Sequence, residues 1–384
     1  MRRLFFTILV CIAISLVALS HWYVADRLFV RPGLEAANLR VNAGLLGLLG
    51  LLMVVQPIVE RTLPRKISIW INWPAYIWMG VGFLFVVFLG FFDLLALLAA
   101  TVFSQSSPVW EYLSFHHRAN GAFIIVSIVS ALSLRSGLRF PTLVRHRVAL
   151  DRWPQGLKGF KVLQINDIHI GPMYGARYAK KLARVVNEEK PDLIAVVGDV
   201  IDGTVRKVGA TVDPLANLRA KHGVYYVTGN HEHYYHPQQW CEKFASLGWR
   251  VLRNESDLIQ TDGGSFYVAG CFDYRGALDD CSEDQQKALG GRKENIPTIF
   301  LAHDPSSFHK AKTFDVDFQL SGHTHGGQIW PFHYLVRLAI KYVAGFYKEE
   351  RSLLYVSRGT GFWGPPMRFL APQEITLHEI HPGT

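Results

Sequence analysis

Long uncharged stretches dominate the first third of the chain. A helix that spans a bilayer needs about 20 mostly apolar residues. Only Asp93 separates the third stretch from the fourth, without turn residues beside it, so we interpret these two as one long helix that begins near Pro74. Four membrane-spanning helices are therefore predicted within residues 1–140. The uncharged stretches cover residues 4–25, 41–59, 67–92, 94–110 and 119–134.

Two features of this region have a second interpretation. Arg2 and Arg3, the apolar run after them and Ala18-Leu19-Ser20 are typical of a secretory signal peptide, but the further apolar stretches favour a retained anchor. Asp93 is a functional candidate because it is an ionisable residue in an apolar segment. A helix that begins near Pro74 would cross the bilayer by the time it reaches Asp93, which places Asp93 at the far interface. We favour this interfacial position.

The pattern changes from residue 160 onward, where short apolar runs alternate with amphipathic segments. Residues 178–189 repeat apolar positions at helical spacing, and such alternation of strands with helices predicts α/β layers. We therefore expect a transmembrane region over residues 1–140 and an α/β domain over residues 141–384. The strand candidates cover residues 160–165, 192–197, 224–227, 266–269, 298–302 and 316–320.

Charge follows the same division. Residues 1–140 contain 11 Lys or Arg and 5 Asp or Glu, so they carry most of the net charge of +9. Basic loops between apolar helices fit anionic lipid headgroups better than nucleic acid, so the expected partner is a lipid bilayer. The bias of Lys and Arg in the short loops predicts a multi-pass protein of the inner membrane with a cytoplasmic C-terminal domain. The four cysteines form no CxxC pair and are interpreted as free thiols.

Polar motifs follow five of the predicted strands. A single Asp-x-His or Gly-Asn motif usually marks a turn. Five such motifs in this order, each behind an apolar strand, instead predict one site, because ligands of α/β folds bind at the carboxyl ends of strands. Oxygen and nitrogen ligands of these types suit Mn, Fe or Zn. The motifs are Asn166-Asp167-Ile168-His169, Gly198-Asp199-Val200-Ile201-Asp202, Gly229-Asn230-His231-Glu232, Ala302-His303-Asp304-Pro305 and Gly322-His323-Thr324-His325.

These motifs resemble those of the calcineurin-like metallophosphoesterases over residues 145–384. The resemblance implies a two-sheet α/β sandwich around two divalent metal ions. It also implies that His231 lies beside the metals and protonates the leaving oxygen. Seven residues would hold the ions, with Asp199 bridging both: Asp167, His169 and His325 at the first metal, and Asn230, His303 and His323 at the second.

Elementary chemistry supports these roles. Two cations about 3.5–4 Å apart stabilise both the attacking and the leaving oxygen of an in-line displacement, and a shared anion such as Asp199 reduces their repulsion. Water activated between them attacks phosphorus, and an imidazole with a pKa near 6.5 supplies the proton that the leaving group needs. We therefore expect a metal-dependent hydrolase that cleaves phosphoester or pyrophosphate bonds. The competing hypothesis is a non-catalytic membrane sensor or transport protein whose phosphoesterase-like domain only binds a ligand.

One departure from the family pattern and several further motifs indicate which branch of the family the chain resembles. Asp202 stands where the iron-containing purple branch has Tyr, so we expect Asp202 to orient a ligand His instead. Gly171-Pro172, the run 326–329 and the run 357–361 are similar to the membrane-anchored bacterial branch that includes enzymes similar to UDP-2,3-diacylglucosamine pyrophosphatases. This second resemblance implies a phosphorylated or nucleotide-linked, lipid-linked substrate. Arg358 is then either a bidentate phosphate ligand or a surface arginine.

One segment after the last motif has two interpretations. Residues 334–347 are apolar with interspersed basic residues, a pattern that predicts an amphipathic helix. Such a helix either rests on the membrane surface beside the site or packs into the core. The second arrangement is the commoner one.

Overall fold

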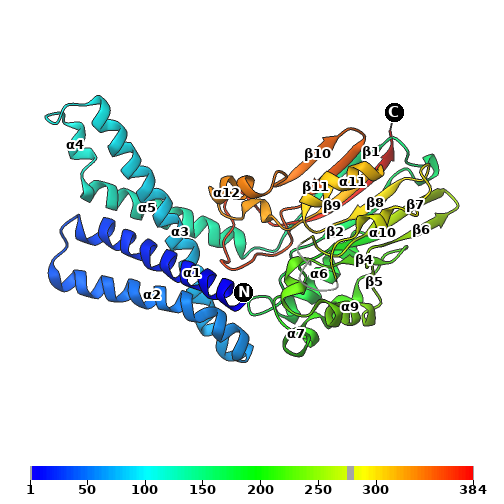
Figure 1. Cartoon of the computed structure of the whole chain (residues 1–384), viewed down its shortest axis with the longest axis horizontal. Coiled ribbons are helices and arrows are strands. Elements are labelled where there is room, and N and C mark those ends of the chain that lie inside the picture. The colour runs from blue at the N-terminus through cyan, green and yellow to red at the C-terminus, as the bar shows by residue number, and fades with distance from the viewer. Residues whose placement is uncertain (1, 275–280, 384) are drawn as a thin grey trace. The chain divides into compact units, whose positions relative to one another are not determined.

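The N-terminal part of the chain is helical. The computed structural model describes residues 2–274 and 281–383. Within them, four helices are long and apolar enough to cross a membrane, as predicted. Two shorter segments, η1 (Asp26–Val30) and α4 (Val109–Tyr112), extend or connect them (Figure 1). The long helices are α1 (Arg2–Ala25), α2 (Ala36–Thr62), α3 (Arg65–Val102) and α5 (Phe115–Gly137).

The third helix differs from its prediction at its start. It begins at Arg65 and contains Pro74 in its interior, so the prediction that the helix begins near Pro74 is wrong. A proline removes one backbone hydrogen bond, and apolar membrane helices tolerate it where they pack against neighbours. Asn72 and Ala75, on either side of Pro74, are fully buried. The helix therefore continues through the proline as one element of 38 residues.

Asp93 lies in the second half of α3 and is paired. Its carboxylate accepts hydrogen bonds from Tyr23 (2.9 Å), Arg27 (2.7 Å) and Arg118 (2.6 Å). These partners come from α1, η1 and α5. The carboxylate therefore joins the helices through hydrogen bonds and ion pairs.

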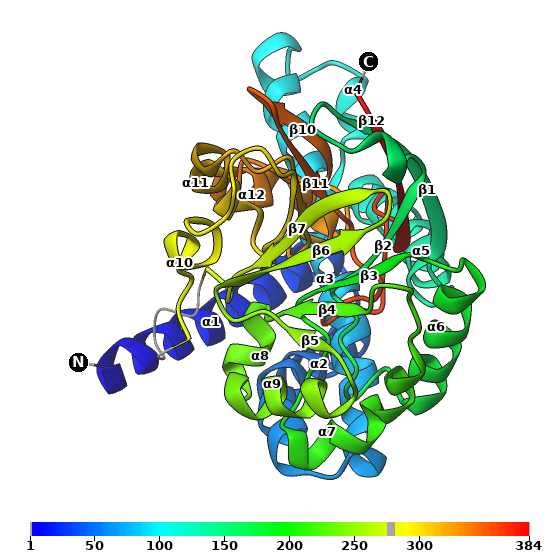
Figure 2. The same ribbon diagram turned by 90° about the vertical axis from the view of Figure 1, so that its right-hand side faces the viewer.

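The C-terminal part of the described chain forms two six-stranded sheets, as the resemblance implies (Figure 2). Strands β2, β3, β4 and β5 are parallel to one another, as are β7, β8, β9 and β11. The first sheet has the order β1 (Thr142–Leu150), β12 (Glu374–Pro382), β2 (Phe160–Ile165), β3 (Leu193–Val197), β4 (Val224–Val227) and β5 (Arg250–Val251). The second has the order β10 (Gly345–Glu349), β11 (Ser352–Val356), β9 (Phe318–Ser321), β8 (Thr298–Leu301), β7 (Gly264–Gly270) and β6 (Glu255–Thr261).

The two sheets pack face to face over a shared apolar core. Val162 and Leu193 of the first sheet and Phe266 and Leu320 of the second belong to one buried cluster. Helices cover the outer faces (Figure 2). They are α6 (Ala176–Glu188), α7 (Val205–Val212) and α9 (Pro237–Ser246) on the first sheet, and α10 (Gln285–Leu289) and α11 (Phe308–Ala311) on the second. This two-layer arrangement brings the carboxyl ends of the parallel strands to one edge.

The amphipathic segment after β9 is shorter than predicted. Helix α12 covers Phe332–Ala339 and ends where Ile340 adopts an extended conformation. The chain then passes through buried Tyr342 and Val343 into β10. None of the eight residues of α12, all of them described, is buried. The interpretation of this segment as a core-packing helix is therefore wrong.

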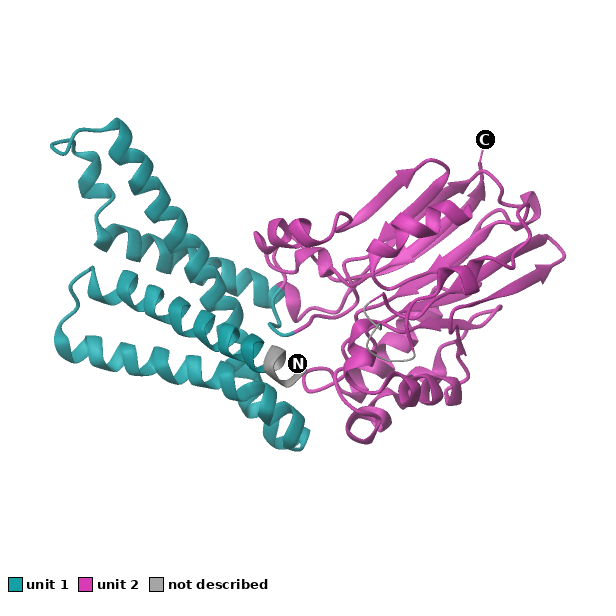
Figure 3. Ribbon diagram, viewed as in Figure 1, with its two compact units in different colours: residues 1–135, 364–367 teal, residues 136–363, 368–384 magenta. Residues whose placement is uncertain are grey.

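The chain divides into two compact units (Figure 3). The helical unit comprises Met1–Arg135 together with Gly364–Met367. The α/β unit comprises Ser136–Trp363 and Arg368–Thr384.

Candidate metal centre

The polar motifs all follow parallel strands. Asp167 and His169 follow β2, and Asp199 and Asp202 follow β3. The short helix α8 (Asn230–Tyr234) follows β4. His303 follows β8, and His323 and His325 follow β9. The structure therefore brings residues from both sheets to one edge of the sandwich.

The backbone of these loops is strained. Non-glycine residues rarely adopt positive φ, and each such residue costs of order 1–3 kcal/mol unless the surrounding structure holds it. Such strain is concentrated at functional sites in proteins. Five of the candidate ligands are among the described non-glycine residues with positive φ: Asp167 (50°), His169 (53°), Asp199 (50°), His323 (72°) and His325 (51°).

Two glycines allow the loops to approach one another. A Cβ atom at Gly229 would overlap the carboxylate and backbone of Asp199, and one at Gly322 would overlap Asn166 and the carboxylate of Asp167. A side chain at either position would push apart the loops that carry the candidate ligands. The glycines in these two motifs therefore serve close packing of the site.

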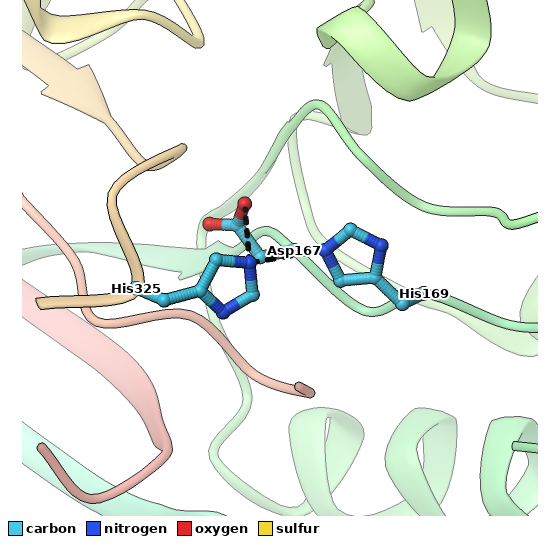
Figure 4. Close-up of side chains that lie close together, drawn as sticks. All are labelled: Asp167, His169 and His325. Carbon is cyan, nitrogen blue, oxygen red and sulfur yellow. Dashed lines mark hydrogen bonds and ion pairs between the residues drawn. The ribbon is translucent and has the colours of Figure 1, made fainter. Parts of the chain in front are cut away.

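The first group of candidate ligands consists of Asp167, His169 and His325. Their side chains point toward one another (Figure 4). The Nε2 atoms of His169 and His325 lie 3.1 Å apart, and Nε2 of His325 lies 3.4 Å from Oδ1 of Asp167. All three residues are buried. One carboxylate and two imidazoles at these distances fit a single divalent ion.

A second group consists of Asp199, His303 and His323. Nε2 of His303 lies 3.2 Å from Oδ2 of Asp199 and 3.9 Å from Oδ1 of Asp167. Asp199 also belongs to a third group, with His169 and His231. Asp199 therefore lies where the groups overlap.

One buried atom supports a cation at the second group. Oδ1 of Asn230 has no hydrogen-bond partner within the described part of the chain, while Nε2 of His303 faces the carboxylates of Asp199 and Asp167. Buried polar atoms in native proteins are nearly always satisfied, and an unsatisfied one costs about 1–3 kcal/mol. A divalent ion would supply a partner for this oxygen. The oxygen and nitrogen ligands present therefore fit divalent metal.

The two central carboxylates differ in their electrostatics. Burial raises the pKa of Asp167. Burial would also raise the pKa of Asp199, but the facing imidazoles of His303 and His231 outweigh it and hold that pKa well below its usual range. Asp199 is therefore the carboxylate that keeps its negative charge most firmly.

His231 is oriented by Asp202. Its Nδ1 lies 2.5 Å from Oδ1 of Asp202, which also bonds Nδ1 of His169 at 3.1 Å. Nε2 of His231 faces Asp199, 3.9 Å from Oδ2. Burial disfavours the charged imidazole, but Asp199 and Asp202 outweigh this effect and raise the pKa of His231 to about 9. The expected contact between Asp202 and a ligand histidine is present, and the same carboxylate also holds His231.

Glu232 has a role that the sequence did not reveal. Its buried carboxylate accepts hydrogen bonds from three backbone N–H groups, those of Asp199 (3.0 Å), Val200 (2.8 Å) and Gly229 (2.7 Å). Burial, followed by the charge of Asp199, raises the pKa of Glu232 to about 8. Glu232 therefore fixes the backbone that carries Asp199. Its place in the motif 229–232 was the only signal available.

Arg368 also has a role that the sequence did not reveal. Its guanidinium is buried and donates to the backbone carbonyls of His325 (2.9 Å), Arg358 (2.9 Å) and Ala371 (3.2 Å). It also contacts Nδ1 of His325 at 2.8 Å and the carbonyl of Gly361. No carboxylate pairs with it within residues 2–274 and 281–383. Arg368 therefore fixes the loop of His325 through backbone groups, and no local pattern signalled this.

Arg358 forms an ion pair within the protein. Its guanidinium bonds the buried carboxylate of Glu374 at 2.9 Å, and its backbone N–H bonds the same carboxylate at 3.0 Å. A paired arginine is less available for a bidentate contact with phosphate. The interpretation of Arg358 as a structural arginine near the surface is the one that this contact supports.

The segment that carries these motifs is similar to known proteins. The model of the calcineurin-like phosphoesterase family matches residues 160–327. An "uncharacterized metallophosphoesterase" of Helicobacter pylori is 34% identical over 289 residues, which cover 73% of this chain and 76% of that protein. A "transmembrane protein with metallophosphoesterase domain" of Danio rerio is 30% identical over 322 residues, which cover 80% of this chain and 73% of that protein. A metallophosphoesterase of Aquifex aeolicus is 31% identical over 256 residues, 63% of this chain and 92% of that protein.

Proposed function

The chain belongs to the calcineurin-like phosphoesterase family and is a metal-dependent phosphoesterase, and on this premise we propose that it holds two divalent ions at the edge of its two sheets. Asp199 would be shared by both ions. Asp167, His169 and His325 would hold the first ion, and Asn230, His303 and His323 would hold the second.

The overlap of the ligand groups carries the proposal. Asp199 belongs to two of the three groups, and His303 lies within 4 Å of both Asp199 and Asp167. A carboxylate shared between two sets of ligands is what two neighbouring cations require. Imidazole, amide and carboxylate ligands suit Mn²⁺, Fe²⁺ or Zn²⁺.

The ions, when bound, would supply the positive charge that stabilises the attacking and leaving oxygens of a phosphoryl displacement. His231 supplies the proton for the leaving oxygen. The contact of its Nδ1 with Asp202 leaves Nε2 facing Asp199, and a pKa of about 9 keeps the ring protonated at neutral pH. Asp202 thus orients the acid and stabilises its charge.

Hydrolysis of bis-p-nitrophenyl phosphate with added Mn²⁺ tests this function. Full-length protein should be active, and Asp199→Ala should lose both bound metal and activity. His231→Ala should lose activity but keep its metal, because His231 is not assigned as a ligand. Asp262→Ala and His309→Ala, at exposed positions, are the matched controls. Full activity in both site variants would overturn the proposal. A protein that binds metal but hydrolyses nothing would also overturn it. The non-catalytic sensor or transport hypothesis predicts that second result.

The finer proposal concerns location and substrate. We infer a multi-pass protein of the inner membrane with a cytoplasmic α/β unit, supported by the four apolar helices and by the distribution of Lys and Arg in the loops. A membrane anchor is most useful when the substrate is also in the membrane, so we infer a lipid-linked phosphoester or pyrophosphate, including nucleotide-linked lipids. Turnover of such lipids should exceed turnover of the same headgroup without its acyl chains. Equal turnover of both would refute lipid linkage and leave the phosphoesterase assignment intact.

A further inference from the structure

Helix α12 exposes apolar side chains along its whole length. Phe332, Tyr334, Leu335 and Leu338 are all exposed, and Leu338 retains 84% of its accessible surface. A soluble helix normally buries one apolar face, and contiguous exposed apolar side chains usually mark an interaction surface. The surface of α12 therefore needs a partner.

Two further exposed apolar residues belong to the same region. The side-chain amide of Gln328 donates to the backbone carbonyl of Trp363 (2.8 Å) and accepts from the backbone N–H of Trp363 (3.1 Å). The backbone N–H of Phe369, which precedes exposed Leu370, bonds the carbonyl of Gln328 at 3.0 Å. The apolar rim, as we call this surface, consists of Phe332, Tyr334, Leu335, Leu338, Trp363 and Leu370.

The rim adjoins the metal centre. Its helix follows the loop of His323 and His325 directly, and a Cβ atom at Gly327 would overlap the backbone of His333 in the first turn of α12. The ring of Trp363 lies 6.0 Å from the ring of His231, edge to face. A partner bound at the rim would therefore lie beside the reacting atoms.

Three observations indicate a lipid bilayer as this partner. Residues 138–141 alone link β1 to α5, one of the four helices that are proposed to span the membrane, and four residues reach at most about 14 Å. Tyr and Trp, both present in the rim, are the residues that favour the membrane interface. Arg337 on α12 is exposed and has no acidic partner among the described residues, and a free cation beside apolar side chains suits anionic headgroups.

We propose that the apolar rim inserts into the interface of the bilayer in which the four helices are anchored. The side chains of α12 would then lie about 5–10 Å into the boundary between headgroups and acyl chains. The metal centre would open at the membrane surface, beside the headgroups. This contact is independent of the substrate proposal, because it concerns the bilayer itself.

Lipid-dependent quenching of a fluorophore tests the insertion. The full-length chain with Cys11→Ser keeps three buried cysteines, so a single added cysteine can be labelled with an environment-sensitive nitrobenzoxadiazole group. The test variant is Leu338→Cys, and Leu335→Cys on the same helix is a second one. The control is Leu258→Cys, an exposed leucine on β6 at the opposite edge of the second sheet from β10. Each labelled protein is reconstituted into vesicles of phosphatidylcholine and phosphatidylglycerol, with or without doxyl groups on the acyl chains.

Insertion predicts blue-shifted emission at positions 338 and 335 and loss of most of that emission with doxyl lipids. The label at position 258 should keep its emission in both vesicles. Unquenched labels at both test positions would overturn the proposal. A blue shift without quenching would also overturn it, because the rim would then be covered by protein, either a second copy or the chain's own helices. Hydrolysis of bis-p-nitrophenyl phosphate by each labelled protein confirms that it is folded.

Discussion

Replacement of Glu232 by glutamine tests how the bridging carboxylate is positioned. Glu232 is fully buried, and its two oxygens accept three backbone N–H groups. In Glu232→Gln one carboxylate oxygen becomes an NH₂ group. This group cannot accept a hydrogen bond and faces a backbone N–H donor. The most favourable orientation keeps the bonds from Asp199 and Gly229 and leaves the N–H of Val200 without an acceptor. An unsatisfied buried donor costs about 1–3 kcal/mol.

This cost sets the size of the expected effects. A unit of this size loses roughly 2–4 °C of melting temperature per kcal/mol, so we expect a fall of roughly 2–12 °C. Displacement of the Asp199 backbone should also reduce Mn²⁺-dependent hydrolysis by at least about tenfold, since a 1 Å misplacement at a reacting centre can cost about 100-fold. Thermal unfolding and hydrolysis are measured on the full-length protein in detergent above pH 8, where Glu232 is ionised and both of its oxygens are acceptors. Glu242→Gln, at an exposed position on α9, is the control. If Glu232→Gln matched Glu242→Gln in both measurements, the positioning role would be refuted.

Two further substitutions test the groups that orient the site. Arg368→Met removes the guanidinium that holds the loop of His325 and should weaken Mn²⁺ activation several-fold. Arg368→Lys should restore part of this activation. A lower melting temperature with unchanged Mn²⁺ dependence would mean that Arg368 is only structural. Asp202→Asn keeps an oxygen for His231 but removes one of the negative charges that raise the pKa of His231 to about 9. A general acid acts below its pKa, so the alkaline limb of the kcat/KM profile should move to lower pH, and an unmoved limb would show that His231 is not the proton donor.

Local pattern was enough to predict half of the twelve strands of the described chain. The predicted strands match β2, β3, β4, β7, β8 and β9, because short apolar runs between polar motifs have few other stable arrangements in an α/β fold. The four apolar helices follow from length and composition alone. The boundary near Pro74 was wrong because a proline is a weak stop signal where neighbouring helices pack around it.

Contacts between distant segments could not be predicted in the same way. Glu232 acts through the backbone of residues 199 and 200, and Arg368 acts through carbonyls of four separate residues. Such contacts leave no periodicity and no spacing in the sequence. The exposure of α12 was equally hidden, because an amphipathic pattern is the same whether a helix faces a protein core or a membrane.

The metal content of the purified protein tests the central claim most directly. Full-length protein and Asp199→Ala are equilibrated with excess Mn²⁺, freed of unbound ions and analysed by inductively coupled plasma mass spectrometry. Two ions per chain in the unmodified protein, and one or none in Asp199→Ala, are the expected results. A protein that retains no divalent ion, or an Asp199→Ala variant that retains two, would contradict a dimetal centre bridged by Asp199.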